Sequence, residues 1–107
     1  MEPYIIYSAS SHMKDKVAWN EWVYCGIGND LKKDTIANAI NEYFEDSTLY
    51  FVNVRKNSTD IKKENVLERI ETELEKHDLF IWDSLFEKVM EFNKIGVMRK
   101  GIIRMPK

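Results

Sequence analysis

The feature that most constrains the fold is the alternation of two kinds of apolar spacing along the chain. Residues 31–45 and 62–77 repeat their hydrophobic side chains at intervals of three and four, which predicts two amphipathic helices. Residues 48–54 and 79–82 are instead short runs of β-branched and aromatic residues, which predict strands. A chain that alternates these two patterns is typical of a sheet covered by helices.

Weaker patterns extend this scheme to both ends of the chain. The aromatic and β-branched run at 3–9 predicts a first strand, and residues 97–103 predict a final strand or a tight hairpin. Ser84 and Glu87 match a capping box, so a helix is expected over 84–93. Residues 12–24 fit a helix or a short extended piece. The expected order is β-α-α-β-α-β-α-β, a mixed sheet of about four strands in the α/β or α+β class.

Length and composition favour a single globular domain, 1–107, because 107 residues with 44% hydrophobic content can bury one core. A polar loop is expected at 55–60. The single cysteine, Cys25, rules out an intramolecular disulfide. The N-terminus lacks the features of a signal peptide, and the apolar runs are too short for a membrane span. We therefore expect a cytoplasmic protein with no membrane contact.

Charge is distributed unevenly along the second half of the chain. Residues 64–83 carry seven acidic and two basic side chains, whereas residues 84–107 carry two acidic and six basic ones. This polarity is expected from a solvated helix face followed by a lysine-guarded edge strand, or from complementary patches used on a partner. The net charge of −2 makes general nucleic-acid binding an unfavourable interpretation.

The chain has no complete pattern for catalysis or for a cofactor. Gly26 and Gly28 form a lone G-x-G without the third glycine that a dinucleotide-binding turn requires. The histidines, His12 and His77, are far apart and belong to no cluster with metal-ligand spacing. We therefore predict no cofactor and no metal. A binding function is favoured over catalysis.

One group of residues, the alternative pocket, could instead form the active site of an enzyme. Ser10, Ser11 and His12 would follow the first strand, and Asp83 would follow the third, at the sheet edge where ligands bind. Together these groups could serve a small hydrolase or a phosphate-handling enzyme. Each also has a structural explanation, since the serines suit a helix cap and Asp83 precedes a capping box.

Aromatic residues are the other candidates for recognition. Trp19 and Trp22 are three residues apart, so they share a face on a helix but diverge on an extended strand. Core packing is one explanation; the other is an interface, where tryptophan is enriched. Carboxylates on the 62–77 helix could add electrostatic steering towards a basic partner. The predicted partner-binding residues are Trp19, Trp22, Glu68, Glu71, Glu75 and Asp78.

The leading functional hypothesis is a non-enzymatic protein-binding module. Its small size and acidic helix suggest an immunity-type or inhibitor protein that neutralises a basic partner, such as a nuclease toxin. Besides the small enzyme, a second alternative is a homo-oligomeric structural subunit. In that subunit the last strand would pair with its copy across a two-fold axis.

Overall fold

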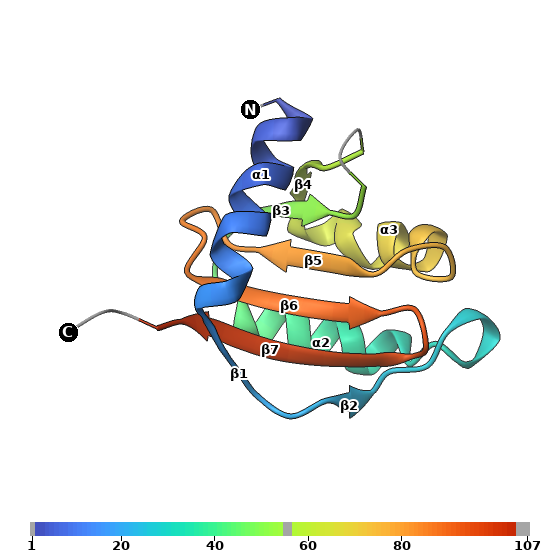
Figure 1. The fold of residues 1–107 in the computed structure, drawn as a ribbon. Coiled ribbons are helices and arrows are strands. Elements are labelled where there is room, and N and C mark those ends of the chain that lie inside the picture. The colour runs from blue at the N-terminus through green and yellow to red at the C-terminus, as the bar shows by residue number, and fades with distance from the viewer. Residues whose placement is uncertain (1, 55–56, 105–107) are drawn as a thin grey trace.

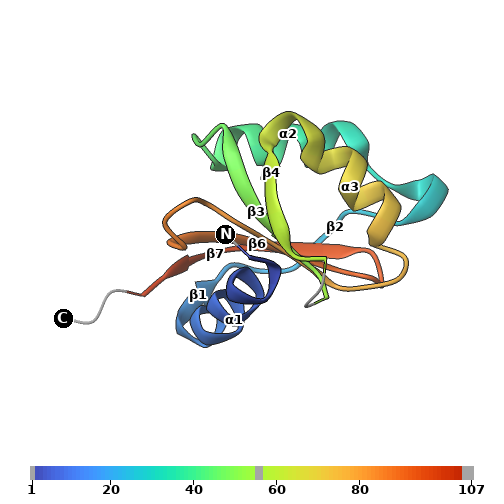
Figure 2. The same cartoon turned by 90° about the horizontal axis from the view of Figure 1, so that it is seen from above.

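The chain folds into three layers, with a seven-stranded antiparallel sheet between helices on both faces (Figure 1). The computed structural model describes residues 2–54 and 57–104. Helix α1 covers one face, while α2 and α3 lie side by side on the other, as Figure 2 shows from above. The helices of this small α+β domain are α1 (Pro3–Met13), α2 (Lys33–Tyr43) and α3 (Val66–Glu73).

Every strand pair in the described sheet is antiparallel, and the strand order is β1-β7-β6-β5-β3-β4. The short strand β2 also pairs with β7, so β1 and β2 share one edge of the sheet. Strand β7 has partners on both sides. The strands are β1 (Val17–Trp19), β2 (Val23–Tyr24), β3 (Thr48–Val52), β4 (Thr59–Lys62), β5 (Leu79–Trp82), β6 (Lys88–Asn93) and β7 (Val97–Ile103).

The two helix patterns and three of the strand patterns seen in the sequence are present. Helix α2 buries Ile36 and Ile40, and α3 buries Val66 and Ile70, as their spacing predicts. Strands β3, β5 and β7 occupy the runs expected at 48–54, 79–82 and 97–103. One-sided burial explains the success for the helices, because it appears directly as periodic spacing in the sequence, whereas β3 and β5 are recognised by their β-branched and aromatic composition.

The sheet separates two hydrophobic cores. The larger core lies under α2 and α3 and includes the buried side chains of Ile36, Phe51, Ile70 and Phe92. The smaller core lies under α1, where Ile6 packs with Val52, Trp82 and Val89 from the sheet. Central strands therefore contribute buried side chains to both faces.

The strand predicted at 3–9 is wrong, because these residues begin α1. Pro3 occupies the first turn, where the lack of an amide proton costs nothing. Ile6 and Ser10 then lie one turn apart on the buried side of the helix. The β-branched and aromatic residues at 3–9 favour a strand locally, but burial of one side of a helix against the sheet outweighs that preference.

The helix predicted at 84–93 is also wrong, because residues 88–93 form β6. Val89 enters the smaller core while Met90 and Phe92 enter the larger one, so a central strand is apolar on both faces. Because both faces are buried, the sequence lacks the alternation of apolar and polar residues that is typical of a strand. Ser84 is not a helix cap; its hydroxyl and amide both donate to Asp46.

The sheet itself differs from the expected one, since it has seven antiparallel strands rather than about four in a mixed arrangement. The additional strands β1, β2 and β4 are short or polar, and the sequence of β6 predicts a helix. Arg55 and Lys56 of the expected 55–60 loop lie outside the described residues, and Thr59 already belongs to β4.

Candidate functional site

Helix α3 presents a stripe of carboxylates to solvent. Val66 and Ile70 face the core, while the exposed Glu68 and Glu71, with Glu64 in the turn just before the helix, recur at intervals of three and four on the other side. Glu75, just beyond the helix, is exposed as well. In the described part of the chain, no lysine or arginine lies within ion-pair distance of Glu64, Glu68 or Glu75.

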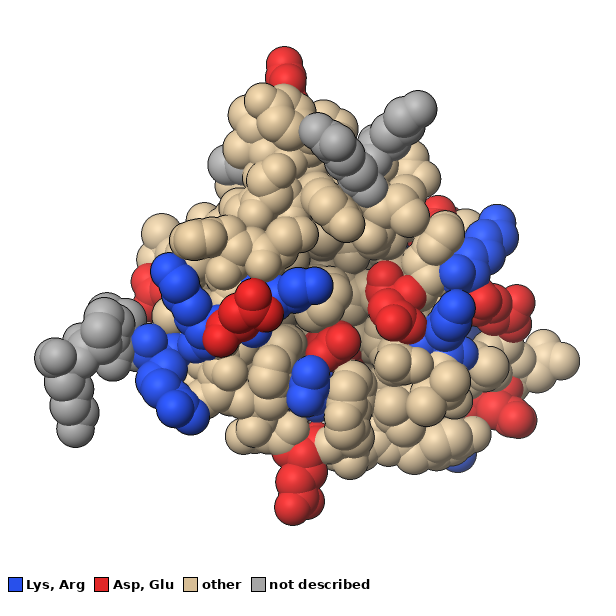
Figure 3. All heavy atoms as spheres, viewed as in Figure 1, with Lys and Arg blue, Asp and Glu red and all other residues tan. Residues whose placement is uncertain are grey.

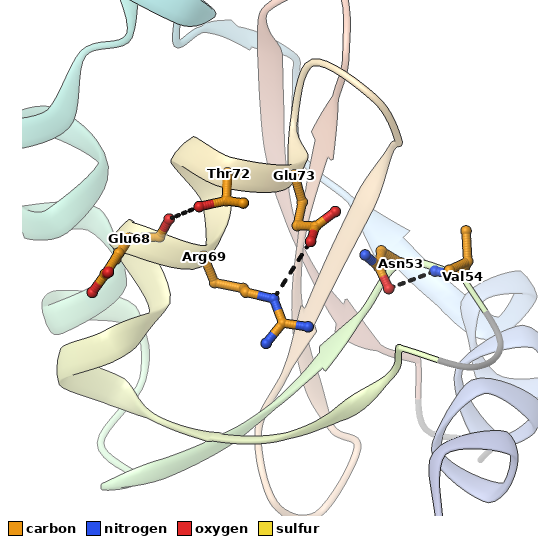
Figure 4. Close-up of polar contacts among 6 residues, drawn as sticks. All are labelled: Asn53, Val54, Glu68, Arg69, Thr72 and Glu73. Carbon is orange, nitrogen blue, oxygen red and sulfur yellow. Dashed lines mark hydrogen bonds and ion pairs between the residues drawn. The ribbon is translucent and has the colours of Figure 1, made fainter.

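The only arginine of α3 points away from this stripe. Its guanidinium carbon lies 5.2 Å from the centre of the Phe51 ring, and Arg69 Nε lies 3.8 Å from Oε1 of Glu73. Figure 4 shows the side chain of Arg69 extending towards Glu73 and the amide of Asn53. The cation is thus held against the sheet while the carboxylates stay outside, which keeps the outer face of α3 acidic.

Two of the predicted partner-binding carboxylates already have internal contacts. Glu71 lies 3.5 Å from Lys33 Nζ of α2, in an exposed ion pair of the kind that contributes little to stability. Asp78 accepts a hydrogen bond from the amide of Lys94 at 2.9 Å, which ties the end of α3 to the β6–β7 turn. Glu68 and Glu75 are the freer members of the predicted set.

Trp19 and Trp22 lie on an extended edge, yet they do not diverge. Trp19 pairs with Gly101, and Val23 pairs with Met98, so the edge advances four residues while β7 advances three. One extra residue is therefore accommodated as a β-bulge, which shifts the alternation of side chains. As a result both indoles reach the same face of the sheet.

The two indoles meet on a single guanidinium. The Cζ of Arg99 lies 4.1 Å from the ring centre of Trp19 and 4.3 Å from that of Trp22. Glu91 accepts a 2.8 Å hydrogen bond from Arg99 Nε and neutralises its charge. Trp22 remains 41% exposed, so the stack fixes a partly exposed aromatic ring in one position.

The predicted partner-binding residues therefore form two separate groups. Trp19 packs with Phe80 and the smaller core on the α1 face, whereas α3, with Glu68 and Glu71, covers the opposite face (Figure 2). Asp78, which follows α3, lies beside α1 instead. No single flat surface contains both groups. The sequence could not show this separation, because it depends on the sheet that lies between them.

The basic C-terminal third is also divided by the fold. Figure 3 shows Lys and Arg side chains gathered on the α1 face near the C-terminal end, with acidic side chains among them. Lys88 and Lys100 lie instead about the Tyr43 ring, with their Nζ atoms 5.5 Å and 5.4 Å from its centre. Burial, and to a smaller degree the charge of Asp83, raises the pKa of the Tyr43 phenol.

The residues of the alternative pocket have separate structural contacts. Ser10 accepts a 2.8 Å hydrogen bond from Trp82 Nε1 inside the smaller core. His12 Nε2 lies 3.3 Å from Lys16 Nζ on the exposed side of α1. Asp83 Oδ1 accepts from the amides of Glu87 and Lys88 and holds the β5–β6 turn. Among the described residues, no hydrogen bond or ion pair joins His12 to Asp83.

Ser10 and Ser11 line the same recess of about 230 Å³. The recess is also lined by Tyr7 of α1, by Lys14 just after that helix, and by His77 and Asp78 after α3. The lining holds the ammonium of Lys14 and the carboxylate of Asp78, and also Asn53, whose buried Nδ2 has no hydrogen-bond partner among the described residues.

Sequence reasoning missed Arg99 and Glu91, the residues that organise the aromatic edge. The sequence gives no sign that Glu91 and Arg99 are neighbours, because the pattern at 84–93 predicts a helix and Glu91 lies in that segment. In the described residues, no three His, Cys, Asp or Glu side chains are grouped as a metal site would require. No described helix is long and apolar enough to cross a membrane.

Comparison of the chain with protein-family models, with curated proteins and with solved structures found no match.

Proposed function

We propose that this protein is a non-enzymatic binding module that acts in the cytoplasm and neutralises a basic protein partner, in the manner of an immunity or inhibitor protein. The observation that supports it is the orientation of α3. Glu68 and Glu75 are exposed and form no ion pair with the described residues, while Arg69 is turned against Phe51 and Glu73.

Electrostatics gives this arrangement a physical role. A row of carboxylates on one helix face produces a local negative potential that accelerates encounter with a cationic surface. Carboxylates can also occupy positions that phosphates would take in a cationic cleft, which suits a nuclease toxin as the partner. Such an interaction weakens as salt concentration rises, because exposed charges are screened over about 8–10 Å.

The proposal is tested by capture from the native cell with the tagged chain as bait, washing at increasing salt. We expect one stoichiometric basic protein that is lost at high salt. Addition of the chain to that purified protein should then inhibit its activity. Recovery of the chain alone, or only with itself, would contradict the proposal.

A pair of matched triple variants locates the surface. Glu68→Gln, Glu71→Gln and Glu75→Gln together should weaken binding about 10–100-fold, mainly through the association rate. The control combines Glu2→Gln, Asp15→Asn and Glu87→Gln, three exposed positions flanking α1 or in the β5–β6 turn. Both variants change net charge by +3, so equal losses would show that overall charge rather than α3 is responsible.

A further inference from the structure

The edge of the sheet at β2 exposes a strip of apolar residues whose side chains alternate between the two faces of the sheet. Trp22, Val23 and Tyr24 follow one another in the chain and are 41%, 54% and 57% exposed. Ile95, 74% exposed, belongs to the β6–β7 turn that pairs with this edge. Single exposed hydrophobic residues are ordinary, but four at one open sheet edge favour a surface that another chain covers.

Backbone contacts hold this strip in a defined geometry. Gly96 O accepts hydrogen bonds from the amides of Cys25 at 2.8 Å and Gly26 at 3.0 Å, so the strip and the β6–β7 turn form one unit. Arg99 stacks on Trp22 and is itself held by Glu91. The Trp22 side chain therefore has little freedom left to lose when the strip is covered, which favours association.

The hydrogen-bond pattern leaves one residue of β2 unpaired on its outer side. In an antiparallel ladder, residues alternate between bonding the neighbour and pointing away from it. Cys25 bonds towards β7, and Tyr24 is opposite Val97 at the next position. The alternation therefore turns both the amide and the carbonyl of Tyr24 towards the open edge.

We propose that β2 is a self-association edge, at which two copies of this chain pair antiparallel across a two-fold axis. A donor and an acceptor on the same residue are satisfied together when Tyr24 meets Tyr24 of a second copy. The apolar strips of the two copies then cover each other. This edge replaces the last strand as the pairing edge, because β7 already has neighbours on both sides.

The charges beside the strip match an antiparallel arrangement. Glu21 precedes β2, while Lys32 follows it and lies beside its other end, where its amide donates to Cys25 O at 2.8 Å. Its Nζ lies 6.0 Å from the centre of the Tyr24 ring. Antiparallel pairing brings Glu21 of each copy towards Lys32 of the other, whereas parallel pairing would bring like charges together.

A cysteine placed on the axis tests the geometry directly. Opposed residues in a hydrogen-bonded antiparallel pair have Cα atoms about 5.5 Å apart, within the range for a disulfide. Tyr24→Cys should therefore form a disulfide-linked dimer under mild oxidation, while Ile102→Cys, at a 52% exposed position on β7, should not. Native Cys25 is fully buried and serves as an internal control. Equal cross-linking of the two variants, or none in either, would overturn the proposal.

Sedimentation of the full chain provides a second measurement that does not depend on cross-linking. We expect a reversible dimer that Val23→Lys weakens about 100-fold, because it places two lysines diagonally across the two-fold axis, about 7–8 Å apart, within an apolar contact. Leu85→Lys, in the β5–β6 turn at 71% exposure, should leave the dimer intact. A strictly monomeric native chain, or equal effects of the two lysines, would refute the interface.

A charge swap decides the orientation. Glu21→Lys alone should weaken the dimer about fivefold, since each exposed pair contributes at most about 1 kcal/mol. Adding Lys32→Glu should restore it. A double variant as weak as the single one would overturn antiparallel pairing. Because β2 and α3 are separate elements, loss of this dimer would leave capture of a basic partner by α3 unaffected.

Discussion

Arg99 and Glu91 face each other across β6 and β7, and two nitrogens of Arg99 each lie 2.8 Å from the same oxygen, Oε1 of Glu91. Both side chains are largely shielded, with 25% and 13% of their surface exposed. The pair anchors Trp19 and Trp22 through the guanidinium plane. One ion pair inside the sheet therefore determines the shape of the aromatic edge.

Removing Arg99 should be costly for stability. Arg99→Ala leaves Glu91 without a counter-charge and removes the surface on which two indoles stack, so we expect a loss of about 2–4 kcal/mol in unfolding free energy. Urea unfolding followed by circular dichroism measures the loss. Arg104→Ala, at an exposed position, is the control and should change stability by less than about 0.5 kcal/mol. Similar values for both would contradict a structural role of the pair.

Gly101 is required by the close approach of β1. A Cβ at this position would lie 2.2 Å from Cγ1 of Val17 and 2.8 Å from Cε3 of Trp19. Gly101→Ala should therefore destabilise the fold by about 1–3 kcal/mol through overpacking. The double variant Gly101→Ala with Val17→Ala should recover part of that loss, as a double-mutant cycle would show. Strict additivity would mean that the contact with Val17 is not the cause.

Ser10 and Ser11 are adjacent but should behave differently. Ser10→Ala leaves the buried Nε1 of Trp82 without an acceptor, which costs about 1–3 kcal/mol. Ser11→Ala removes no recorded hydrogen bond and should be close to neutral. Thermal unfolding of the two variants makes the comparison. An equal and small effect would show that Trp82 finds another partner, such as water.

Asp46 should titrate abnormally because of Ser84. Hydrogen bonds from the side chain and then the amide of Ser84 lower the pKa of Asp46 below its ordinary value of 3.8. A carboxyl group with a lowered pKa in the folded state contributes stability above the unfolded pKa and loses it as pH falls through the folded pKa.

Ser84→Ala should raise the pKa of Asp46 towards 3.8, as carboxyl NMR titration would show. The stability difference between native chain and variant should be constant near neutral pH and shrink as pH falls below about 3.8. Leu85→Ala, in the same exposed turn, is the control. An unchanged pKa in Ser84→Ala would contradict the assignment.

The acidic stripe of the candidate site could be predicted, because exposure of a charged helix face follows from the periodic burial of its opposite face. Glu68, Glu71 and Glu75 are exposed as that argument requires. The placement of both tryptophans on one face of the sheet could not be predicted. Trp19 and Trp22 share a face only because a bulge inserts one residue opposite β7, and bulges depend on pairing with a distant strand.

By itself the sequence determined the helices that are buried on one side only, α2 and α3, since each carries its contact surface as a spacing of three and four. It also determined β3 and β5, whose short runs of β-branched and aromatic residues are typical of strands. Tertiary structure alone decided α1 and β6. Residues 3–9 have strand-like composition but become helical because Ile6 and Ser10 pack against Trp82, and β6 lies at the centre of a sheet that is buried on both faces. Where burial comes from distant partners rather than from one repeating face, local spacing no longer reports the structure.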